Sequence, residues 1–453
     1  MMMSLSEAAK AMSGQMAGAD SRFSSVSIDT RNINPGDLFV AIRGDNFDAN
    51  DFVDDAARAG AVAAVVGRDL DTDLPRIVVE DTRQALGRLA AEWRNRLTIK
   101  VVGVTGSNGK TTVKEMVALV LDQIANVLYT HGNLNNEIGV PLTLLKLQDD
   151  NKFAVVEMGA NHAGEIAYTS SLTAPDVAII TNAGAAHLEG FGSLRGVAQA
   201  KGELLSSLPD TGVAVLNADD KYFEFWRELV GRKRVISFGL GAGADVNASN
   251  IRLIRTKSAF ENKFVLKYGS ITGSVCLNLA GHHNVYNALA ASAACFALGI
   301  AFKDVCAGLS RLQPVAGRMQ PIAGMNGALL INDSYNANPT SFTAAINSLA
   351  QLDGRLQVIL GAFAELGDSS AELHAEVGMQ AKAAGVEHFY ATGPDADKAV
   401  DAFGSGGYYF ESQEDLIQQS KELLDRQSIV LIKGSRSQRM ERVIDALKVS
   451  EPA

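Results

Sequence analysis

The chain has 453 residues, which is longer than one hydrophobic core usually organises, so about three domains of roughly 150 residues are expected. With 47% hydrophobic and 20% charged residues, its composition is that of a globular protein rather than a disordered or fibrous one. A formal net charge of -10 argues against a nucleic-acid partner, because binding the phosphate backbone requires a basic face.

The cysteines Cys276, Cys295 and Cys306 are odd in number and show no CxxC spacing, so neither a disulfide framework nor a zinc site is indicated. The N-terminal segment lacks the basic start and the apolar stretch of a secretory signal, and it predicts an amphipathic helix. No apolar run reaches the roughly 18 residues that span a bilayer. We therefore expect a cytoplasmic protein without a transmembrane segment.

Short apolar runs that end in Gly, Asn or Asp and precede helical stretches predict parallel strands joined by crossover helices, in three blocks. The first block predicts strands over 37–42, 61–66 and 77–79 and a helix over 52–59. The second predicts strands over 99–104, 153–157, 177–182 and 213–217, an antiparallel insert over 245–279 and an alanine-rich helix over 284–298. The third predicts strands over 328–331, 356–361, 388–391 and 429–432. We therefore predict an α/β chain of three domains, 1–83, 84–313 and 314–453.

The segment Thr105-Gly106-Ser107-Asn108-Gly109-Lys110-Thr111-Thr112 follows a predicted strand and precedes a helical pattern. Its amides would lie at a helix N-terminus, where an anion is stabilised. Glycines at 106 and 109 allow the backbone to curl around a phosphate, Lys110 supplies a cation, and Thr111 offers a hydroxyl to magnesium. Val104 replaces the first glycine of the full G-x-x-x-x-G-K-[ST] motif, yet the strand-loop-helix context favours phosphate binding over a plain turn.

Polar residues end other strands of the second block, and in an open parallel sheet they would converge on one crevice with Lys110. Glu157 ends a strand where a carboxylate needs a cation or hydrogen-bond donors, and either nucleotide-bound magnesium or a structural partner fits. His187 follows the next strand, and Asn217 ends the strand after that. An imidazole suits metal or phosphate binding as well as a structural hydrogen bond. Lys201 has the pattern of an ordinary solvated helix lysine.

Two further segments concentrate short polar side chains. Residues 332–340 lie between a predicted strand and a helix, and residues 281–287 lie at the start of the helix predicted over 284–298. Each suits a ligand, but each is also typical of a capped turn or a helix start, since Asn, Asp, Ser and Pro are the usual turn formers.

The chain resembles the Mur ligase family along essentially its whole length. The resemblance rests on residues 29–31 with 35–41, the loop 105–112, and residues 132–141, 187–192, 333–338, 364–367 and 433–436. It implies an N-terminal domain that holds a uridine nucleotide, a central ATPase domain, and a C-terminal Rossmann-like domain that closes over the site. Asn50, His282 and the pair Ala362-Phe363 stand where relatives more often carry His, Arg and Asp-Met.

The resemblance also implies roles for individual residues. Those for ATP binding are Thr105, Gly106, Ser107, Asn108, Gly109, Lys110, Thr111, Thr112, Asn284, Arg318, Asp333, Tyr335 and Asn336. Those for magnesium are Thr111, Glu157, His187 and Lys201, with Lys201 as a carbamate. The candidate catalytic residues are Lys110, Glu157, His187 and Lys201. Those for the uridine-linked substrate are Ser27, Asp29, Thr30, Arg31, Arg43, Gly44, Asn135 and Asn136. Those on the amine side are Glu365, Lys433, Ser435 and Arg436.

The activity that the resemblance implies is an ATP-dependent ligation that forms an amide bond through an acyl phosphate and releases ADP and phosphate. Residues 133–141 and 333–338 favour the branch that joins D-alanyl-D-alanine to UDP-N-acetylmuramoyl tripeptide in peptidoglycan precursor synthesis. The implied cofactor is a pair of Mg²⁺ ions, and the implied state is a monomer in the bacterial cytoplasm. A sister ligase that adds one amino acid, a folylpolyglutamate-type synthetase, a P-loop kinase and a nucleotide-switched regulatory protein stay open as alternatives.

Overall fold

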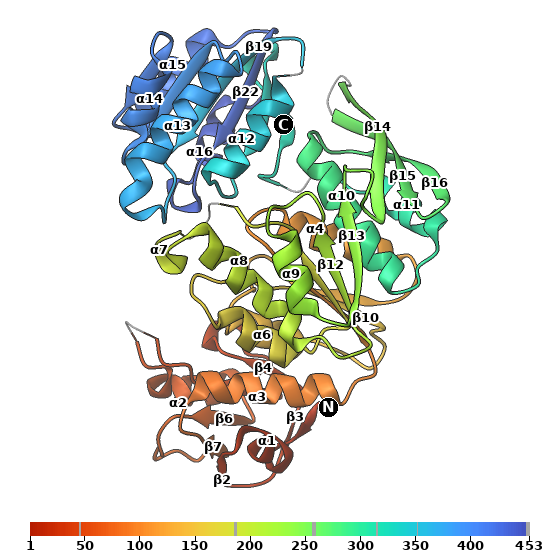
Figure 1. The fold of residues 1–453 in the computed structure, drawn as a ribbon. Coiled ribbons are helices and arrows are strands. Elements are labelled where there is room, and N and C mark those ends of the chain that lie inside the picture. Colours follow the sequence, from red (N-terminus) through yellow and green to blue (C-terminus); the bar gives the residue numbers. More distant parts are fainter. Residues whose placement is uncertain (45–46, 185–187, 256–259, 314–315, 351, 450–453) are drawn as a thin grey trace.

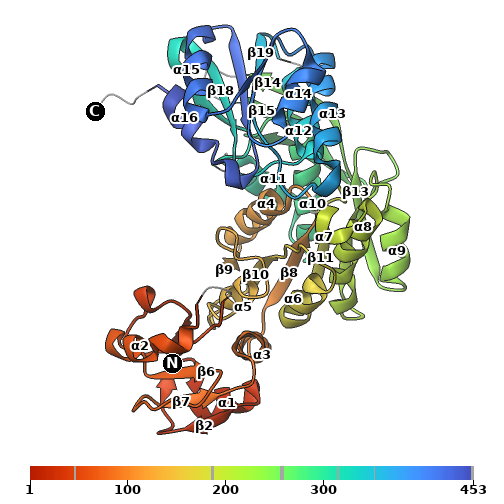
Figure 2. The same ribbon diagram turned by 90° about the vertical axis from the view of Figure 1, so that its left-hand side faces the viewer.

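The computed structural model describes residues 1–44, 47–184, 188–255, 260–313, 316–350 and 352–449. Figure 1 shows three α/β units that follow one another along the molecule, with the N-terminal unit at the bottom and the C-terminal unit at the top. Figure 2 shows the same succession from the side. Each unit is built on one main sheet that contains parallel strands, so the predicted α/β class is confirmed.

The N-terminal unit has a five-stranded sheet in the order β2-β7-β6-β5-β4. Its strands are β2 (Gln15–Ala17), β4 (Ser25–Ser27), β5 (Asp37–Val40), β6 (Ala63–Val66) and β7 (Arg76–Val78), beside a small ribbon of β1 (Met3–Ser4) and β3 (Arg22–Phe23). Its helices are α1 (Leu5–Met12), α2 (Val53–Ala59) and α3 (Thr82–Asn95), with the turns η1 (Thr30–Asn32) and η2 (Ala49–Phe52). The helix predicted at the N-terminus is confirmed as α1, which begins at a capping box between Ser4 and Glu7.

The central unit has a nine-stranded sheet in the order β16-β15-β14-β13-β12-β11-β8-β10-β9. The parallel strands are β8 (Lys100–Thr105), β9 (Val127–Tyr129), β10 (Phe153–Glu157), β11 (Val177–Ile180), β12 (Val213–Asn217) and β13 (Arg234–Gly239). An antiparallel ribbon follows with β14 (Val246–Arg255), β15 (Phe260–Tyr268) and β16 (Ile271–Leu277). The predicted insert is thus antiparallel, and it extends the main sheet because β14 also pairs in parallel with β13.

Helices cover both faces of the central sheet. They are α4 (Lys110–Asp122), α5 (Gly139–Leu144), α6 (Glu165–Thr173), α7 (Leu188–Phe191), α8 (Leu194–Gly202), α9 (Phe223–Val230), α10 (His282–Ala297) and α11 (Phe302–Ser310), with the turn η3 (Glu203–Ser207). Successive residues of a strand face opposite sides, so Val102 packs in the core under α4 and α10 while Val101 packs on the other face. That second core continues into the N-terminal unit through Leu86 and Leu89 of α3.

The C-terminal unit has a six-stranded sheet in the order β17-β18-β22-β19-β20-β21, and β17 is antiparallel to β18. Its strands are β17 (Gln320–Ala323), β18 (Leu329–Asp333), β19 (Arg355–Gly361), β20 (His388–Thr392), β21 (Gly407–Phe410) and β22 (Ser428–Lys433). Its helices are α12 (Pro339–Leu349), α13 (Ser370–Ala383), α14 (Ala396–Phe403), α15 (Gln413–Leu423) and α16 (Glu441–Leu447), with the turns η4 (Met325–Gly327), η5 (Gly367–Ser369) and η6 (Arg436–Gln438).

The sequence patterns miss several strands, and each has a physical reason. β9 is too short to show a period, β13 begins at an exposed arginine, and β21 lies at a sheet edge with Tyr408 and Tyr409 exposed. Across the described residues, every helix is too short or too polar to cross a membrane.

Candidate active site

The phosphate-loop segment connects β8 to α4. Gly109 is the N-cap of α4 with φ 82°, and Gly106 has φ 147°, so both glycines adopt backbone angles that L side chains rarely take. A Cβ added at Gly109 would also lie 2.2 Å from Asn287 Oδ1. Because the first N–H groups of a helix have no partner within it, the loop presents an anion-binding helix N-terminus.

Asn182 holds the first half of this loop. The N–H of Ser107 donates to the carbonyl of Asn182 at 3.0 Å, and the N–H of Asn108 donates to Asn182 Oδ1 at 3.0 Å. Asn182 Nδ2 donates back to the carbonyl of Asn108 at 3.1 Å. These bonds engage the early loop amides, so the amides at the start of α4 are left to meet a phosphate. The sequence patterns do not single out Asn182; its place just beyond the end of β11 is the signal that could have found it.

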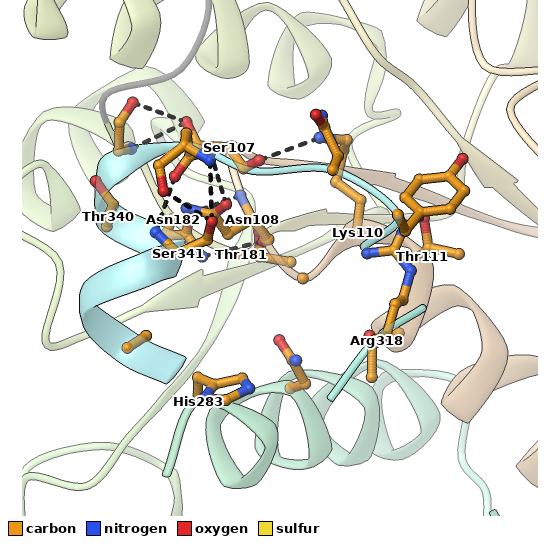
Figure 3. A pocket seen from close by; sticks show the side chains of 18 of the residues that line it. Ser107, Asn108, Lys110, Thr111, Thr181, Asn182, His283, Arg318, Thr340 and Ser341 are labelled. Carbon is orange, nitrogen blue, oxygen red and sulfur yellow. Dashed lines mark hydrogen bonds between the residues drawn. The ribbon is translucent and has the colours of Figure 1, made fainter. Parts of the chain in front are cut away.

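A cavity of about 930 Å³ lies between the central and the C-terminal unit. Figure 3 looks into it, with Lys110 and Thr111 on one side and Thr340 and Ser341 of α12 on another. The predicted site residues that line it are Ser107, Asn108, Gly109, Lys110, Thr111, Thr112, Asn135, Asn136, Glu157, Lys201, Asn217, Asn284, Arg318, Asp333, Tyr335, Asn336, Lys433 and Arg436. The cavity therefore brings together residues from strand ends of the central sheet and from the C-terminal unit.

Glu157 is a buried carboxylate at the centre of a hydrogen-bond network. Thr111 Oγ donates to Glu157 Oε2 at 2.8 Å, and Asn135 Nδ2 donates to Glu157 Oε1 at 2.9 Å. Within the part of the chain that the structure describes, no Lys or Arg forms an ion pair with Glu157. A buried carboxylate without a protein cation is costly, so the site suits an additional cation.

Lys110 lies over its own loop. Its Nζ donates to the carbonyl of Gly106 at 2.7 Å. It also donates to the carbonyl of Ser107 at 3.4 Å (Figure 3). Burial lowers the pKa of Lys110, and the nearby Glu157 carboxylate opposes that shift. The ammonium is thus held at the mouth of the loop, where a phosphate would contact it.

Lys201 is buried on α8 with 1% of its surface exposed, so the pattern-based prediction of a solvated helix lysine is wrong. Its Nζ lies 5.3 Å from the centroid of the Phe191 ring. Burial, reinforced by the positive charge of Lys110, lowers the pKa of Lys201 to about 7. The helical pattern missed this because Lys201 turns toward the cavity. Part of its amine is therefore neutral near pH 7.

Asn217 lines the cavity, and its Nδ2 donates to the carbonyl of Thr181 at 3.1 Å. The Thr105 hydroxyl donates to the carbonyl of Met158 at 2.8 Å and does not reach the cavity. His187 lies outside the described residues.

The C-terminal unit reaches the loop directly through two side chains. Arg318 Nη2 donates to Thr111 Oγ at 2.8 Å, and its guanidinium lies 4.2 Å from the centroid of the Tyr335 ring. Asn338 Nδ2 donates to Asn108 Oδ1 at 2.9 Å. Asn338 lies in the polar segment 332–340 that the sequence singles out, but it is not among the predicted site residues; its place before Pro339 marks it as a helix N-cap. Both contacts join the two units across the cavity.

Asp333 and Lys433 form a buried ion pair on neighbouring strands. Lys433 Nζ lies 2.6 Å from Asp333 Oδ2 and also donates to the carbonyl of Asn336 at 3.2 Å. Asp333 Oδ1 accepts from the N–H of Met319 at 3.0 Å. The pair therefore anchors the segment around Asn336 at the cavity wall.

The first turn of α10 supplies the wall opposite the loop. Asn284 Nδ2 donates to the carbonyl of Ala280 at 2.7 Å, and Asn284 Oδ1 accepts from Asn287 Nδ2 at 3.1 Å. His283 Nδ1 is buried without a hydrogen-bond partner, although part of the ring is exposed. Burial lowers the pKa of His283 to about 4, so the ring is neutral at pH 7.

Comparisons with known proteins agree with this geometry. Three family models match: Mur ligase family, catalytic domain, over 22–94; Mur ligase middle domain over 104–295; and Mur ligase, glutamate ligase domain, over 317–436. The UDP-N-acetylmuramoyl-tripeptide–D-alanyl-D-alanine ligase of Escherichia coli (strain K12) is 45% identical over 447 residues, which cover 98% of each chain. The chain belongs to the Mur ligase family.

Solved structures support the same assignment. MurF from Acinetobacter baumannii matches with a TM-score of 0.90 at 36% identity and covers 97% of each chain. MurF from Thermotoga maritima, solved in complex with ADP, matches with a TM-score of 0.84 at 29% identity and covers 94% of this chain and 96% of that one. As a member of this family the chain is an ATP-dependent amide ligase.

The residues assigned to the uridine-linked substrate lie in two places in this Mur ligase. Asn135 and Asn136 line the cavity. The others, Ser27, Asp29, Thr30, Arg31, Arg43 and Gly44, lie in the N-terminal unit and do not line it. The hydrogen bond from Arg31 to Asp29, at 2.7 Å, lowers the pKa of Asp29 to about 2, so these two side chains engage each other.

The residues that the resemblance assigns to the amine side are also divided. Lys433 and Arg436 line the cavity, whereas Ser435 and Glu365 do not. The buried Ser435 hydroxyl donates to the carbonyl of Ala362 at 2.7 Å, and Glu365 is exposed with φ 61°. The cavity thus collects the two basic residues of the group, Lys433 at the end of β22 and Arg436 in the turn η6.

Two of the three departures from the family pattern have a structural role. Asn50 is buried, and it donates to Asp48 Oδ1 at 2.6 Å and accepts from the N–H of Gly67 at 3.0 Å. Ala362 and Phe363 are buried in the C-terminal core. His282 is exposed at the start of α10, and nothing in the structure explains its identity.

Proposed function

We propose that this Mur ligase joins D-alanyl-D-alanine to UDP-N-acetylmuramoyl tripeptide and converts ATP to ADP and phosphate, as a step in peptidoglycan precursor synthesis. The observation that carries the proposal is the single cavity in which the phosphate loop, Asn135 and Lys433 meet. The names of relatives that match 93% or more of the chain supply the substrates.

The chemistry proceeds in two displacements. A carboxylate oxygen of the tripeptide attacks the γ-phosphorus of ATP, the bond to the β–γ bridging oxygen breaks, and ADP leaves. The amine of D-alanyl-D-alanine then attacks the acyl carbon and loses a proton, and phosphate leaves. The amides at the start of α4 and the ammonium of Lys110 stabilise the negative charge on the transferred group. Closure between the two units excludes water, which would hydrolyse the acyl phosphate.

We propose that Thr111, Glu157, His187 and a carbamate on Lys201 hold the Mg²⁺ ions. The fit for the first two is chemical: Glu157 is a buried carboxylate without a Lys or Arg ion-pair partner among the described residues, and the Thr111 hydroxyl contacts it. Oxygen ligands of this kind are those that magnesium prefers. When bound, Mg²⁺ neutralises phosphate charge that Lys110 alone does not balance.

The carbamate on Lys201 is supported by its lowered pKa, because only a neutral amine adds carbon dioxide. The amine nitrogen bonds to the carbon of CO₂ and releases a proton, which leaves an anionic oxygen donor in place of a cation. Mass measurement of the intact protein in bicarbonate tests this. We expect the wild type to carry the mass of one added CO₂ and Lys201→Met to carry none. A mass difference between the two proteins that the substitution alone accounts for would contradict the carbamate.

The remaining assignments complete the proposal. We place uridine-nucleotide binding on residues 27–44 of the N-terminal unit and the D-alanyl-D-alanine site near Arg436, with domain boundaries at 83/84 and 313/314. We further propose a monomer that acts in the bacterial cytoplasm and serves cell-wall growth and division.

The test is release of ADP and phosphate by purified protein with each substrate omitted in turn. We expect turnover only when ATP, the UDP-linked tripeptide and D-alanyl-D-alanine are all present. Replacing the dipeptide with a single amino acid separates this ligase from sister enzymes. Turnover that ignores the amine would overturn the proposal.

A further inference from the structure

Lys114 is a buried lysine to which the proposed chemistry gives no role. It lies on α4 one turn after Lys110, and 1% of its side chain is exposed. Its neighbours Val113, Met116 and Val117 are core residues. Burying an ammonium is costly unless specific partners compensate, and an apolar side chain would fill this position without that cost.

The partners of Lys114 join α4 to the end of β9. Its Nζ donates to the carbonyl of Thr130 at 2.5 Å and lies 5.4 Å from the centroid of the Tyr129 ring. It also lies 2.8 Å from Glu115 Oε1, on the same helix. Because Glu115 is on the helix itself, the contact with Thr130 is the one that connects two elements.

Thr130 passes this connection to Glu157. The N–H of Thr130 donates to the carbonyl of Val155 at 3.1 Å, and its hydroxyl accepts from the N–H of Glu157 at 3.0 Å. Glu157 Oε2 then accepts from Thr111, which is on α4. A continuous set of hydrogen bonds therefore runs from Lys114 of α4 through Thr130 and Glu157 to Thr111, which is also on α4.

Thr130 also begins the segment that carries Asn135, whose Nδ2 donates to the second oxygen of Glu157 at 2.9 Å. Movement of Thr130 would therefore shift the backbone of Glu157 and one of its two side-chain donors together. A misplacement of about 1 Å at a catalytic site is enough to lower a rate by about 100-fold.

We propose that Lys114 is a positioning residue, which holds Thr130 and thereby fixes the Glu157 carboxylate relative to the phosphate loop. It contacts neither the cavity nor a substrate site, so it acts through Thr130. The inference rests on the proposed function in that Glu157 serves the Mg²⁺–nucleotide end of the reaction. Replacing Lys114 should therefore change the binding of Mg²⁺ and nucleotide and leave the binding of the amine unchanged.

The experiment compares Lys114→Met, Lys114→Arg and Glu115→Gln with the wild type. Lys100→Met is the matched control, because Lys100 is exposed at the start of β8 and pairs with Asp176. Melting temperature, kcat, the KM for each substrate and the Mg²⁺ concentration at half-maximal rate are measured. Binding of a non-hydrolysable ATP analogue, with Mg²⁺ and with EDTA, gives a readout independent of turnover.

We expect Lys114→Met to lower kcat and to raise the half-saturating Mg²⁺ concentration by about tenfold or more, which is the usual effect of losing an outer support of a metal ligand. The KM for D-alanyl-D-alanine should not change, and Lys114→Arg should restore part of the rate. Glu115→Gln should lower the melting temperature, since it removes the carboxylate paired with the buried ammonium, but it should keep the wild-type Mg²⁺ dependence, since the bond to Thr130 remains. Lys100→Met should behave as wild type.

A Lys114→Met enzyme that melts earlier but keeps the wild-type Mg²⁺ dependence and analogue affinity would overturn the proposal, because its role would then be structural. If Lys114→Met does not fold, Thr130→Val decides: it keeps the carbonyl that Lys114 binds and removes the acceptor for the Glu157 N–H. We expect the same Mg²⁺ shift from it. If the wild type shows no amine-dependent turnover, the proposed function fails, and analogue binding still decides on Lys114.

Discussion

The two lysines that face the cavity from the central unit, Lys110 and Lys201, differ in what holds them. Lys110 donates to carbonyls of its own loop, whereas Lys201 is buried against Phe191 and has its pKa lowered to about 7. The loop motif predicts Lys110 because its spacing is local. The side-chain environment of Lys201 depends on how α8 packs, which no local pattern contains.

Replacing Lys110 with alanine should lower turnover by about 100-fold or more, the usual effect of removing one preorganised charge from a transition state. The fold should persist, because among the described residues the hydrogen bonds of Lys110 go to loop carbonyls. ADP release and the melting temperature check this. A variant with wild-type turnover would remove Lys110 from the mechanism.

His283 should make the protein less stable in acid. Its pKa is lowered to about 4 by burial, with Lys433 and His282 acting in the same direction and Asp333 opposing them. The unfolded chain binds this proton below about pH 6.5, whereas the folded chain resists it until about pH 4. The stability that the neutral ring contributes is therefore present above pH 6.5 and is lost as the pH falls toward 4.

The loss of unfolding free energy between pH 6.5 and 4 should be smaller in His283→Gln than in the wild type, by on the order of 2 kcal/mol. Urea unfolding at a series of pH values measures it. Parallel stability curves for the variant and the wild type would contradict the assignment.

At the scale of elements, the start of α12 serves two purposes. Asn338 Oδ1 accepts from the N–H of Ser341 at 2.8 Å, which caps the helix, while Asn338 Nδ2 donates to Asn108 of the phosphate loop. One side chain thus ties the stability of α12 to the contact between the two units.

Two substitutions separate these purposes. Asn338→Ala should lower the free energy of unfolding by about 1 kcal/mol and also lower turnover, whereas Asn338→Asp keeps the cap acceptor and should lower turnover alone. Ser412→Ala is the control, because Ser412 caps α15 away from the cavity. This substitution should lower the free energy of unfolding and leave turnover unchanged. Equal turnover in Asn338→Asp and the wild type would remove the Asn108 contact from the mechanism.

Most elements could be predicted because their signals are local. Apolar runs such as Phe153–Glu157 and the glycine at 109 mark a strand and a helix start directly. The contacts of Asn182 and Asn338 could not be predicted, because each joins segments far apart in the chain. His187 remains a prediction from the resemblance.

At the scale of the whole molecule, three units follow one another, and two of them, the central and the C-terminal unit, place different chemistry around one cavity. The central sheet supplies the phosphate loop and Glu157 from strand ends, and the C-terminal unit supplies Arg318 and Lys433. The three blocks of the sequence predict this succession, but not that Arg318 would contact Thr111. A P-loop kinase would not need two further α/β units, so the architecture favours a ligase.

The central claim is tested most directly by mass analysis of the product formed from ATP, UDP-N-acetylmuramoyl tripeptide and D-alanyl-D-alanine. We predict one new species that contains both substrates joined with loss of water, formed in equal amount to ADP and absent when the dipeptide is omitted. A phosphorylated tripeptide as the final product, or ADP formed at the same rate without the dipeptide, would contradict the account.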